Sequence, residues 1–386
     1  MRVALPIAMA SLILVLASRP MDGQMRTAVS PLGSIQMIDA QIGWAVTRRC
    51  GPCPPQVMSG LMLRTTNGGT QWNDVTPVDS SGQRVDFHYF HAYNSDLAWA
   101  EKSSMDLSST EIFRTVDGGR IWKSIAIRTM EVTSISFINP RQGWLIAFEG
   151  AYTLREAVSI YSSTDGGETW IAVSSVPPER KDSLPLTGGK ISITFVNPTT
   201  GWVTVAGDPR PNQPYLYVTR DGGHTWQPQR LPLPPEVKPP WEASPVPPRF
   251  FTPREGIFSA FFTLRNDSGE RTGGLAVFYA THDSGTTWTY VAPAPAVYHA
   301  VADMNHAWSL NGGLLRVTND GGRQWATLPP NPLLVDVTQL DFVSSDVGWA
   351  VRNARVRLDP PTFPFLLKTL DGGHTWGPVA YTILRQ

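Results

Sequence analysis

An eight-residue motif that occurs seven times constrains the fold of this chain more than any other feature. The motif reads Ser/Thr-x-Asp/Asn-Gly/Ser-Gly-x-x-Trp, as in TTNGGTQW and TLDGGHTW. Its Asp or Asn residues are Asn67, Asp117, Asp165, Asp221, Asp283, Asp320 and Asp371, and its Trp residues are Trp72, Trp122, Trp170, Trp226, Trp288, Trp325 and Trp376. A period of about 50 residues is typical of proteins in which each repeat is one supersecondary unit.

A second motif, a strand-like run that ends in Gly/Ala-Trp, interleaves with the first. Clear copies are IQMIDAQIGW, ISFINPRQGW, ITFVNPTTGW and LDFVSSDVGW, and weaker copies end at Trp99 and Trp308. An apolar residue usually lies seven positions before this Trp, and a turn-forming residue lies five positions before it. In the fifth unit the same offsets place Phe258 in the Trp position, with Phe251 and Pro253 before it. Of the 14 Trp residues, only Trp241 lies outside the two motifs.

Each unit has the pattern of four short antiparallel strands. In the third unit, β-branched and aromatic residues concentrate at about 134–138, 144–148, 158–162 and 169–174, with Asx, Gly and Pro between them. One four-stranded sheet of this size cannot bury both of its faces, so the units must stack. The sequence therefore predicts an all-β fold, a single seven-bladed β-propeller of four-stranded antiparallel blades. An open β-solenoid is the alternative, although its repeats are usually shorter.

The chemistry of the eight-residue motif fits a turn between the third and fourth strands of each blade. The Asp or Asn side chain can accept backbone N–H groups within the turn, and the glycines can adopt a positive φ. The Trp can then wedge its large apolar surface between neighbouring sheets. We therefore interpret these Asp and Asn residues as structural.

The first 17 residues have the features of a signal peptide. Met1-Arg2 precedes an apolar run over residues 3–17, which is short for a membrane span of about 20 residues. We expect export to a periplasmic, extracellular or lumenal compartment with cleavage near Ala17, and an uncleaved signal anchor is the alternative. Residues 18–32 would form an N-terminal tail. Residues 33–386 would form the propeller, with a Pro-rich insertion at about 228–253 that we interpret as an extended surface strap.

Composition narrows the function. The 32 basic residues balance 32 acidic ones, so the chain lacks the basic excess that nucleic-acid binding requires. The seven His are scattered, the Gly-Gly pairs are explained by turns, and no pair of carboxylates stands out as a glycosidase site. We therefore expect no catalytic, cofactor-binding or metal-binding residues and no nucleic-acid partner.

The two motifs together resemble a known family. The eight-residue motif is similar to the Asp-box, or bacterial neuraminidase repeat, and the combined pattern over residues 33–380 resembles the photosystem II stability and assembly factors and their non-photosynthetic bacterial relatives. The resemblance implies a non-enzymatic propeller that acts as a protein-interaction or assembly scaffold. Asp-boxes also occur in sialidases and xyloglucanases, so the alternative is a carbohydrate-binding or divergent sialidase-like or glycoside-hydrolase-like propeller.

Variation in loop length indicates which face binds a partner. In a propeller, the connections between second and third strands share one face, and here their lengths vary most, at residues 48–59, 102–110, 207–214 and 266–273. We expect this face to bind another envelope or membrane protein, with a glycan as the alternative, and we expect a monomer. The candidate contacts are Arg48, Arg49, Arg352, Arg355, Arg357 and Trp241.

The evidence for these contacts is chemical. Ring closure would make the five Arg residues neighbours, and guanidinium groups suit carboxylates and backbone carbonyls. A solvated surface with scattered counter-charges explains the Arg residues equally well. Trp241 could anchor a partner, but we favour a role in pinning the strap to its own blade. Cys50 and Cys53, in a Cys-Gly-Pro-Cys sequence, are predicted to form a local disulfide, with redox activity, metal binding or free thiols as alternatives.

Overall fold

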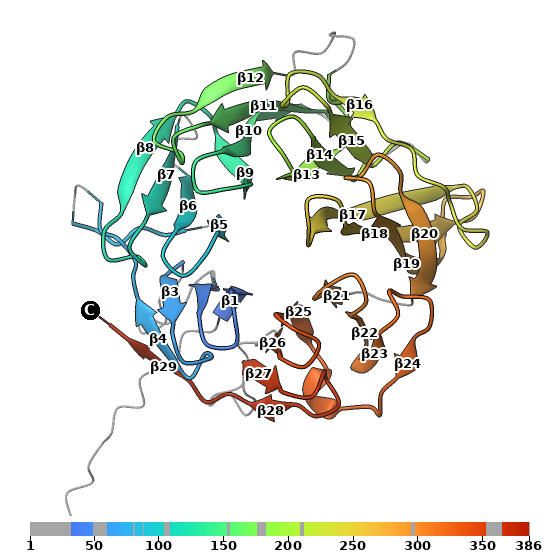
Figure 1. Ribbon diagram of the computed structural model, residues 1–386. Helices are drawn as coiled ribbons and strands as arrows, with labels where there is room; N and C mark the ends of the chain where they lie inside the picture. The colour runs from blue at the N-terminus through green and yellow to red at the C-terminus, as the bar shows by residue number, and fades with distance from the viewer. Residues whose placement is uncertain are drawn as a thin grey trace, which may run out of the picture.

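The computed structural model describes residues 32–48, 60–79, 82–87, 89–103, 109–152, 155–175, 183–208, 212–294, 298–352 and 365–385. Seven sheets surround a central axis as the blades of a ring (Figure 1). Six sheets have four strands and one has five. The predicted all-β seven-bladed propeller is thus confirmed. The predicted signal peptide lies outside the described residues.

Each blade is built from consecutive strands, and the first strand of each is the innermost. Blades one to three comprise β1 Leu32–Met37, β2 Gly43–Thr47, β3 Met62–Thr65, β4 Gln71–Asp74; β5 Tyr89–Ala92, β6 Ala98–Ser103, β7 Thr110–Thr115, β8 Lys123–Ile127; and β9 Glu131–Phe137, β10 Gly143–Tyr152, β11 Arg155–Ser163, β12 Ile171–Ser175. Blades four and five comprise β13 Gly189–Phe195, β14 Gly201–Ala206, β15 Leu216–Thr219, β16 Gln227–Pro228; and β17 Trp241–Phe250, β18 Gly256–Arg265, β19 Arg271–Thr281, β20 Thr289–Ala294. Blades six and seven comprise β21 Tyr298–Val301, β22 Ala307–Asn311, β23 Leu314–Thr318, β24 Ala326–Thr327; and β25 Val337–Phe342, β26 Gly348–Arg352, β27 Leu366–Thr369, β28 Gly377–Pro378. A 3-10 turn, Pro332–Leu334, joins the last two blades, and β29 Thr382–Leu384 ends the fold.

Stacked aromatic rings hold neighbouring blades together. The ring of Trp144 on β10 stacks on that of Phe195 on β13, with centroids 3.8 Å apart, and Phe195 meets Trp226 edge-on. The indole Nε1 of Trp144 also donates to the Gly222 carbonyl, 2.9 Å away in the next blade. Trp308 repeats this arrangement on Phe342 at 3.5 Å. Since these rings are almost completely buried, each blade boundary is a small hydrophobic core.

Hydrogen bonds within the Asp-box shape each turn between the third and fourth strands. In blade three, the Asp165 carboxylate accepts the Thr169 N–H at 2.9 Å and the Ser163 hydroxyl at 2.8 Å. The same hydroxyl accepts the Gly167 N–H, and Gly166 and Gly167 have φ values of 82° and 89°. Equivalent bonds occur at Asn67, Asp117, Asp221, Asp283, Asp320 and Asp371. These side chains are therefore engaged within their own turns.

The fifth blade corrects the predicted register by one residue. Gly256 pairs with Phe250 across β17 and β18, so Ile257, and not Phe258, occupies the Trp position. The Thr252 hydroxyl accepts the N–H groups of the following turn, as Asx residues do in other blades. The preceding Gly sets the register because the ring of Phe250 lies against it. A Cβ on that Gly would lie 2.8 Å from the ring.

The predicted surface strap is shorter than the sequence indicated. Residues 241–250 form β17, the innermost strand of blade five, so that only the residues before it form a connection. An inner-edge strand can accommodate Pro245, Pro247 and Pro248 because one of its sides has no strand partner, and the register shifts between residues 246 and 249. The Pro-rich composition therefore concealed a strand.

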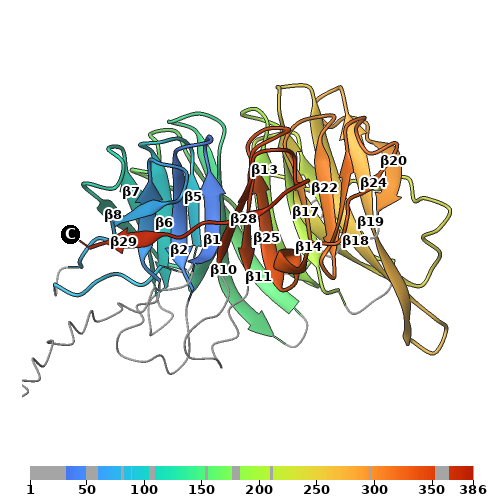
Figure 2. The same ribbon diagram turned by 90° about the horizontal axis from the view of Figure 1, so that it is seen from below.

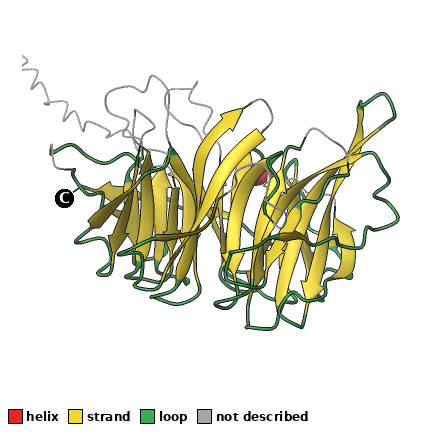
Figure 3. Cartoon of the chain, turned by 90° about the horizontal axis from the view of Figure 1, so that it is seen from above, coloured by secondary structure: helices red, strands yellow, loops and turns green. Residues whose placement is uncertain are grey.

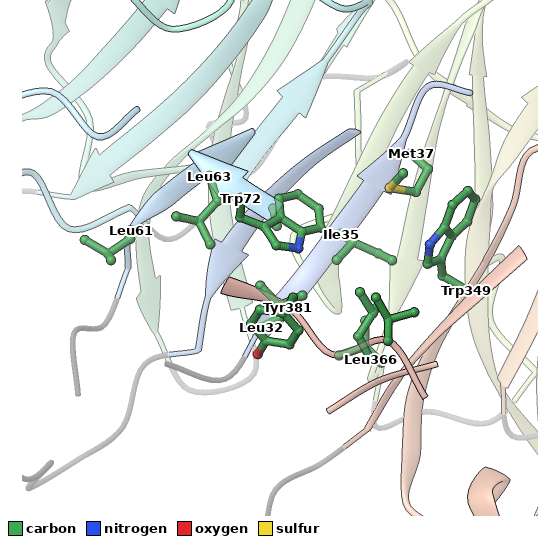
Figure 4. Close-up of a cluster of buried hydrophobic side chains, with 12 residues drawn as sticks. Leu32, Ile35, Met37, Leu61, Leu63, Trp72, Trp349, Leu366 and Tyr381 are labelled. Atoms are coloured by element: carbon green, nitrogen blue, oxygen red, sulfur yellow. The ribbon is translucent and has the colours of Figure 1, made fainter. Parts of the chain in front are cut away.

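The C-terminus closes the ring on the first blade. Strand β29 pairs in parallel with β4, the outermost strand of blade one (Figure 1). Trp349 of blade seven donates its indole N–H to the Gly68 carbonyl of blade one at 3.1 Å. Figure 4 shows Trp349 and Leu366 beside Ile35 and Met37, with Tyr381 completing this buried cluster. The first and last blades are thus joined by side-chain packing and by a fifth strand.

Candidate functional site

The two faces of the ring differ in how far their hairpins and turns project. The Asp-box turns and the turns between first and second strands lie on one face, which we call the Asp-box face. The hairpins between second and third strands lie on the other, the hairpin face, where β10–β11 and β18–β19 extend beyond the body of the ring (Figures 2 and 3). In contrast, β22 and β23 are joined by only Gly312 and Gly313. The variable relief is thus concentrated on the hairpin face.

The longest hairpin is held in shape by its own side chains. Arg265, at the end of β18, forms two hydrogen bonds with the Glu242 carboxylate, at 3.0 and 3.1 Å. Its guanidinium also donates to the Gly269 carbonyl at 2.7 Å. At the tip, the Asn266 side chain accepts the Glu270 N–H and the Ser268 hydroxyl, both at 2.8 Å. These bonds make the exposed β18–β19 tip a structured projection.

The structure separates the predicted partner contacts. Arg48 is half-buried just after β2, whereas Arg352 is only 8% exposed and donates its Nε–H to the Val335 carbonyl at 3.1 Å. Arg352 therefore supports the connection between blades six and seven, and this corrects its prediction as a surface contact. Arg49, Arg355 and Arg357 lie outside the described residues, as do Cys50 and Cys53.

Trp241 is also part of the fold. It begins β17, is buried, and meets the rings of Tyr215 and Phe262 edge-on, with centroids 5.8 and 5.2 Å away. A buried ring in this position cannot anchor a partner. Of the two predicted roles, Trp241 therefore has the structural one within its own blade. It anchors the first strand of blade five, since the strap ends before it.

Polar side chains connect the innermost strands around the ring. Gln36 of blade one bonds both the N–H and the carbonyl of Ala92 in blade two. Gln339 and Asp341 of blade seven bond the backbone of blade one in the same way, and the Asp341 carboxylate accepts the Met37 N–H at 2.7 Å. Burial raises the pKa of Asp341 to about 6, and its hydrogen bond and the positive charge of Arg249 oppose this shift. The carboxyl group of Asp341, which links blades seven and one, thus titrates near pH 6.

Substitution Asp341→Asn is expected to change the pH dependence of stability. Because the pKa is higher in the folded state than in the unfolded state, the contribution of Asp341 is full below about pH 4 and is lost as the pH rises through about 6. The variant should therefore gain stability relative to wild type between pH 4 and 7, on the order of 1 kcal/mol. Urea unfolding across this range measures the difference. A constant difference would contradict the assignment.

Substitution Asp165→Asn provides the opposite sign as a control. Hydrogen bonds from Thr169 and Ser163, against an opposing effect of burial, lower the pKa of Asp165 to about 2. Its contribution is therefore present above about pH 4 and is lost as the pH falls toward 2.

One serine–histidine pair has the components of a nucleophile and a base. The Ser259 hydroxyl lies 2.6 Å from Nε2 of His299. Ser259 is only 3% exposed, and burial lowers the pKa of His299 to about 4. This pair is best explained as a link between blades five and six. Among the described residues, no three His, Cys, Asp or Glu side chains are placed to hold a metal ion.

A cavity of about 620 Å³ opens between blades six and seven on the Asp-box face. Its lining includes the indoles of Trp308 and Trp325 and the carboxylates of Asp320, Asp346 and Asp371. The sequence alone does not indicate this cavity, because its lining residues come from two blades and most of them belong to the repeated motifs. The described part of the chain contains no helix that is long and apolar enough to cross a membrane.

Comparison with known proteins identifies solved structures that have a similar fold. No family model matches the sequence, and no curated protein matches it significantly. The solved structure of YCF48 bound to D1 peptide is 15% identical, with a TM-score of 0.54 over 90% of this chain and 94% of that chain. A GH74 xyloglucanase from Xanthomonas campestris is 13% identical, with a TM-score of 0.58 over 93% of this chain and 54% of that chain. The GH74 enzyme of Niastella koreensis is 12% identical, with a TM-score of 0.51 over 93% and 68%.

At these identities the similarity concerns the fold. This chain spans about half of the xyloglucanase but nearly all of the YCF48 chain. Taken with the Asp-box hydrogen bonds and the ring of seven sheets, the comparison gives one conclusion. The chain is a seven-bladed Asp-box β-propeller whose fold resembles that of YCF48.

Proposed function

We propose that this chain is an exported, non-enzymatic β-propeller that binds another envelope or membrane protein on its hairpin face and acts as an interaction or assembly scaffold. The observation that carries the proposal is the difference between the faces: β18 and β19 extend over ten and eleven residues, whereas β22 and β23 have five each. Solvent-exposed projections on a rigid ring are typical of recognition surfaces. Similarity to a propeller solved with a bound peptide supports the same class.

The hairpin face offers polar groups and charges of both signs to a partner. The turn at the tip of β18–β19 exposes Asp267, Ser268 and Glu270, and Arg271 lies over the ring of Phe261 at 6.0 Å. Arg48 is the described surface member of the predicted basic group, which also includes Arg49, Arg355 and Arg357. Guanidinium groups would bind carboxylates or backbone carbonyls of an extended segment.

Partner capture tests this proposal. The purified chain is expected to retain one partner from solubilised envelope, and the double substitution Arg355→Ala and Arg357→Ala should weaken that binding by about tenfold or more. The matched control is Arg120→Ala, a surface change on the Asp-box face, which should leave the affinity unchanged. Undiminished capture after substitution of all four remaining Arg residues would remove the basic group from the proposal.

A glycoside hydrolase is the competing function, because two GH74 enzymes share the fold. Release of sugar from xyloglucan or from fluorogenic sialosides by the purified chain would overturn the non-enzymatic proposal. Retention on an immobilised glycan without hydrolysis would instead indicate a lectin-like function.

A further inference from the structure

At three blade boundaries, an Arg or Lys side chain of the protein lies over the Trp of the Gly/Ala-Trp motif. Arg64 lies over the ring of Trp44 with its guanidinium carbon 5.8 Å from the centroid, and Arg220 lies over Trp202 at 5.9 Å. At the boundary that closes the ring, Lys368 lies over Trp349 at 4.6 Å. A cation at this distance is attracted to the negative face of the indole. The fold thus repeatedly places a positive group beside this Trp.

The boundary between blades one and two shows what such a cation binds. Arg64 is the cross-strand partner of Trp44, and its Nε–H donates to the Ser95 carbonyl at 2.9 Å. A terminal guanidinium nitrogen lies 3.7 Å from the Asp96 carboxylate. An indole face, a backbone carbonyl and a carboxylate therefore surround one guanidinium group.

The boundary between blades six and seven has the same surroundings without the cation. Trp308 takes the place of Trp44, and Ser345 and Asp346 occupy the same turn positions as Ser95 and Asp96. The cross-strand partner of Trp308, however, is Val317. Its short apolar side chain leaves the cavity of about 620 Å³, to which Ser345 and Asp346 both contribute.

The charges around this cavity favour a positive ligand. Its described lining includes Asp320, Asp346 and Asp371 and contains no Lys or Arg, so His306 and His374 are its basic side chains. Asp371 accepts hydrogen bonds from its own turn, but Asp346 is exposed and forms no ion pair with a described residue. Asp346 is the equivalent of Asp96, which lies beside Arg64 at the boundary between blades one and two. At the boundary between blades six and seven, the carboxylate of Asp346 is therefore open to a ligand.

We infer that this cavity binds the guanidinium group of an arginine side chain supplied by a partner protein. Arginine fits this cavity better than lysine. At the boundary where Lys368 is the cation, the turn has Gln41 and not a carboxylate, whereas the turn beside Arg64 has Asp96, as this cavity has Asp346. The planar group can donate to the Ser345 carbonyl and the Asp346 carboxylate at the same time. This goes beyond the proposed function, since the cavity lies on the Asp-box face.

Titration with N-acetyl-L-arginine methylamide tests the inference without a partner protein. The reporter is the indole N–H of Trp308, which donates to the Gly372 carbonyl at 2.7 Å at the edge of the cavity. Its nuclear magnetic resonance signal should shift in a saturable way. The uncharged citrulline analogue, and the variant Asp346→Asn, should each bind about tenfold more weakly or worse.

Two further variants sharpen the test. Val317→Arg places at this boundary the residue that blade one has, so it should fill the cavity and abolish the shift. Asp96→Asn, the matched control at the occupied boundary, should bind the probe as wild type does. Equal binding of the citrulline analogue, wild-type affinity of Asp346→Asn, or no saturable shift would overturn the inference. Should Val317→Arg fail to fold, the surface substitution Asp346→Asn still decides it. Failure here leaves the hairpin-face proposal intact, because that is tested by partner capture.

Discussion

Replacing Trp144 by Ala is expected to lower the free energy of unfolding by about 3–5 kcal/mol. The side chain is 4% exposed, stacks on Phe195 at 3.8 Å and donates to the Gly222 carbonyl at 2.9 Å. Truncation removes this apolar surface, leaves a cavity between blades three and four, and takes away the hydrogen bond of the carbonyl. Urea unfolding, followed by intrinsic fluorescence and by circular dichroism, measures the loss.

Two variants control for the chemistry of this change. Trp144→Phe keeps an aromatic ring on Phe195 but removes the indole N–H, so it should cost less than Trp144→Ala. Ile171→Ala also shortens an apolar side chain, but Ile171 is 68% exposed on β12, and the change should stay within about 0.5 kcal/mol. A loss below about 1 kcal/mol for Trp144→Ala would show that the ring stack does not hold the blades together.

The blade architecture could be predicted because its signals are local. A turn that needs two residues with positive φ, Gly everywhere except at Ser284, and an Asp or Asn oxygen for its N–H groups leaves nearly the same short pattern in every copy. The Gly before Trp is equally local, since the ring of Phe137 lies against Gly143 and a Cβ there would lie 2.5 Å from it. Seven such patterns in register predict seven blades.

Other features could not be predicted because they depend on contacts distant in the chain. The three residues of β29 have no pattern that indicates parallel pairing with β4, about 300 residues earlier. In blade five, Phe258 fits the spacing of the second motif with Phe251 and Pro253, although the Gly before Ile257 sets the register. The prediction of Arg352 as a surface contact rests on its charge and on ring closure, whereas its packing against the connection between blades six and seven shows that it is buried.

The cavity between blades six and seven also leaves a signal in the sequence. The residue just before the Asp-box is Arg64, Arg114 or Lys368 in blades one, two and seven, whereas blades three to six have Ser162, Val218, Ala280 and Val317 there. Four blades therefore lack a cation at this position, and in blade four Arg220, two residues further on, covers Trp202 instead. The Ser-Asp pair shared by the turns of blades two and seven shows where the acceptors of a cation remain. The chemistry was thus readable once the cross-strand pairing was known.

A photo-reactive amino acid at Ser268 is expected to form a covalent adduct with the partner in intact cells. Ser268 lies at the exposed tip of β18–β19, and the Arg265–Glu242 ion pair lies at the base of this tip. The control position is Arg120, which is exposed on the Asp-box face of blade two, away from the cavity between blades six and seven. A partner that docks on the hairpin face should reach the first position and not the second.

Cross-linking from these two positions tests the central claim, that the hairpin face binds a protein. The predicted result is one discrete adduct from Ser268, identified by mass spectrometry as an envelope or membrane protein, which is absent from Arg120 and reduced by the double substitution Arg355→Ala and Arg357→Ala. An adduct from Arg120 alone, or no protein adduct from Ser268 together with hydrolysis of xyloglucan by the purified chain, would contradict it.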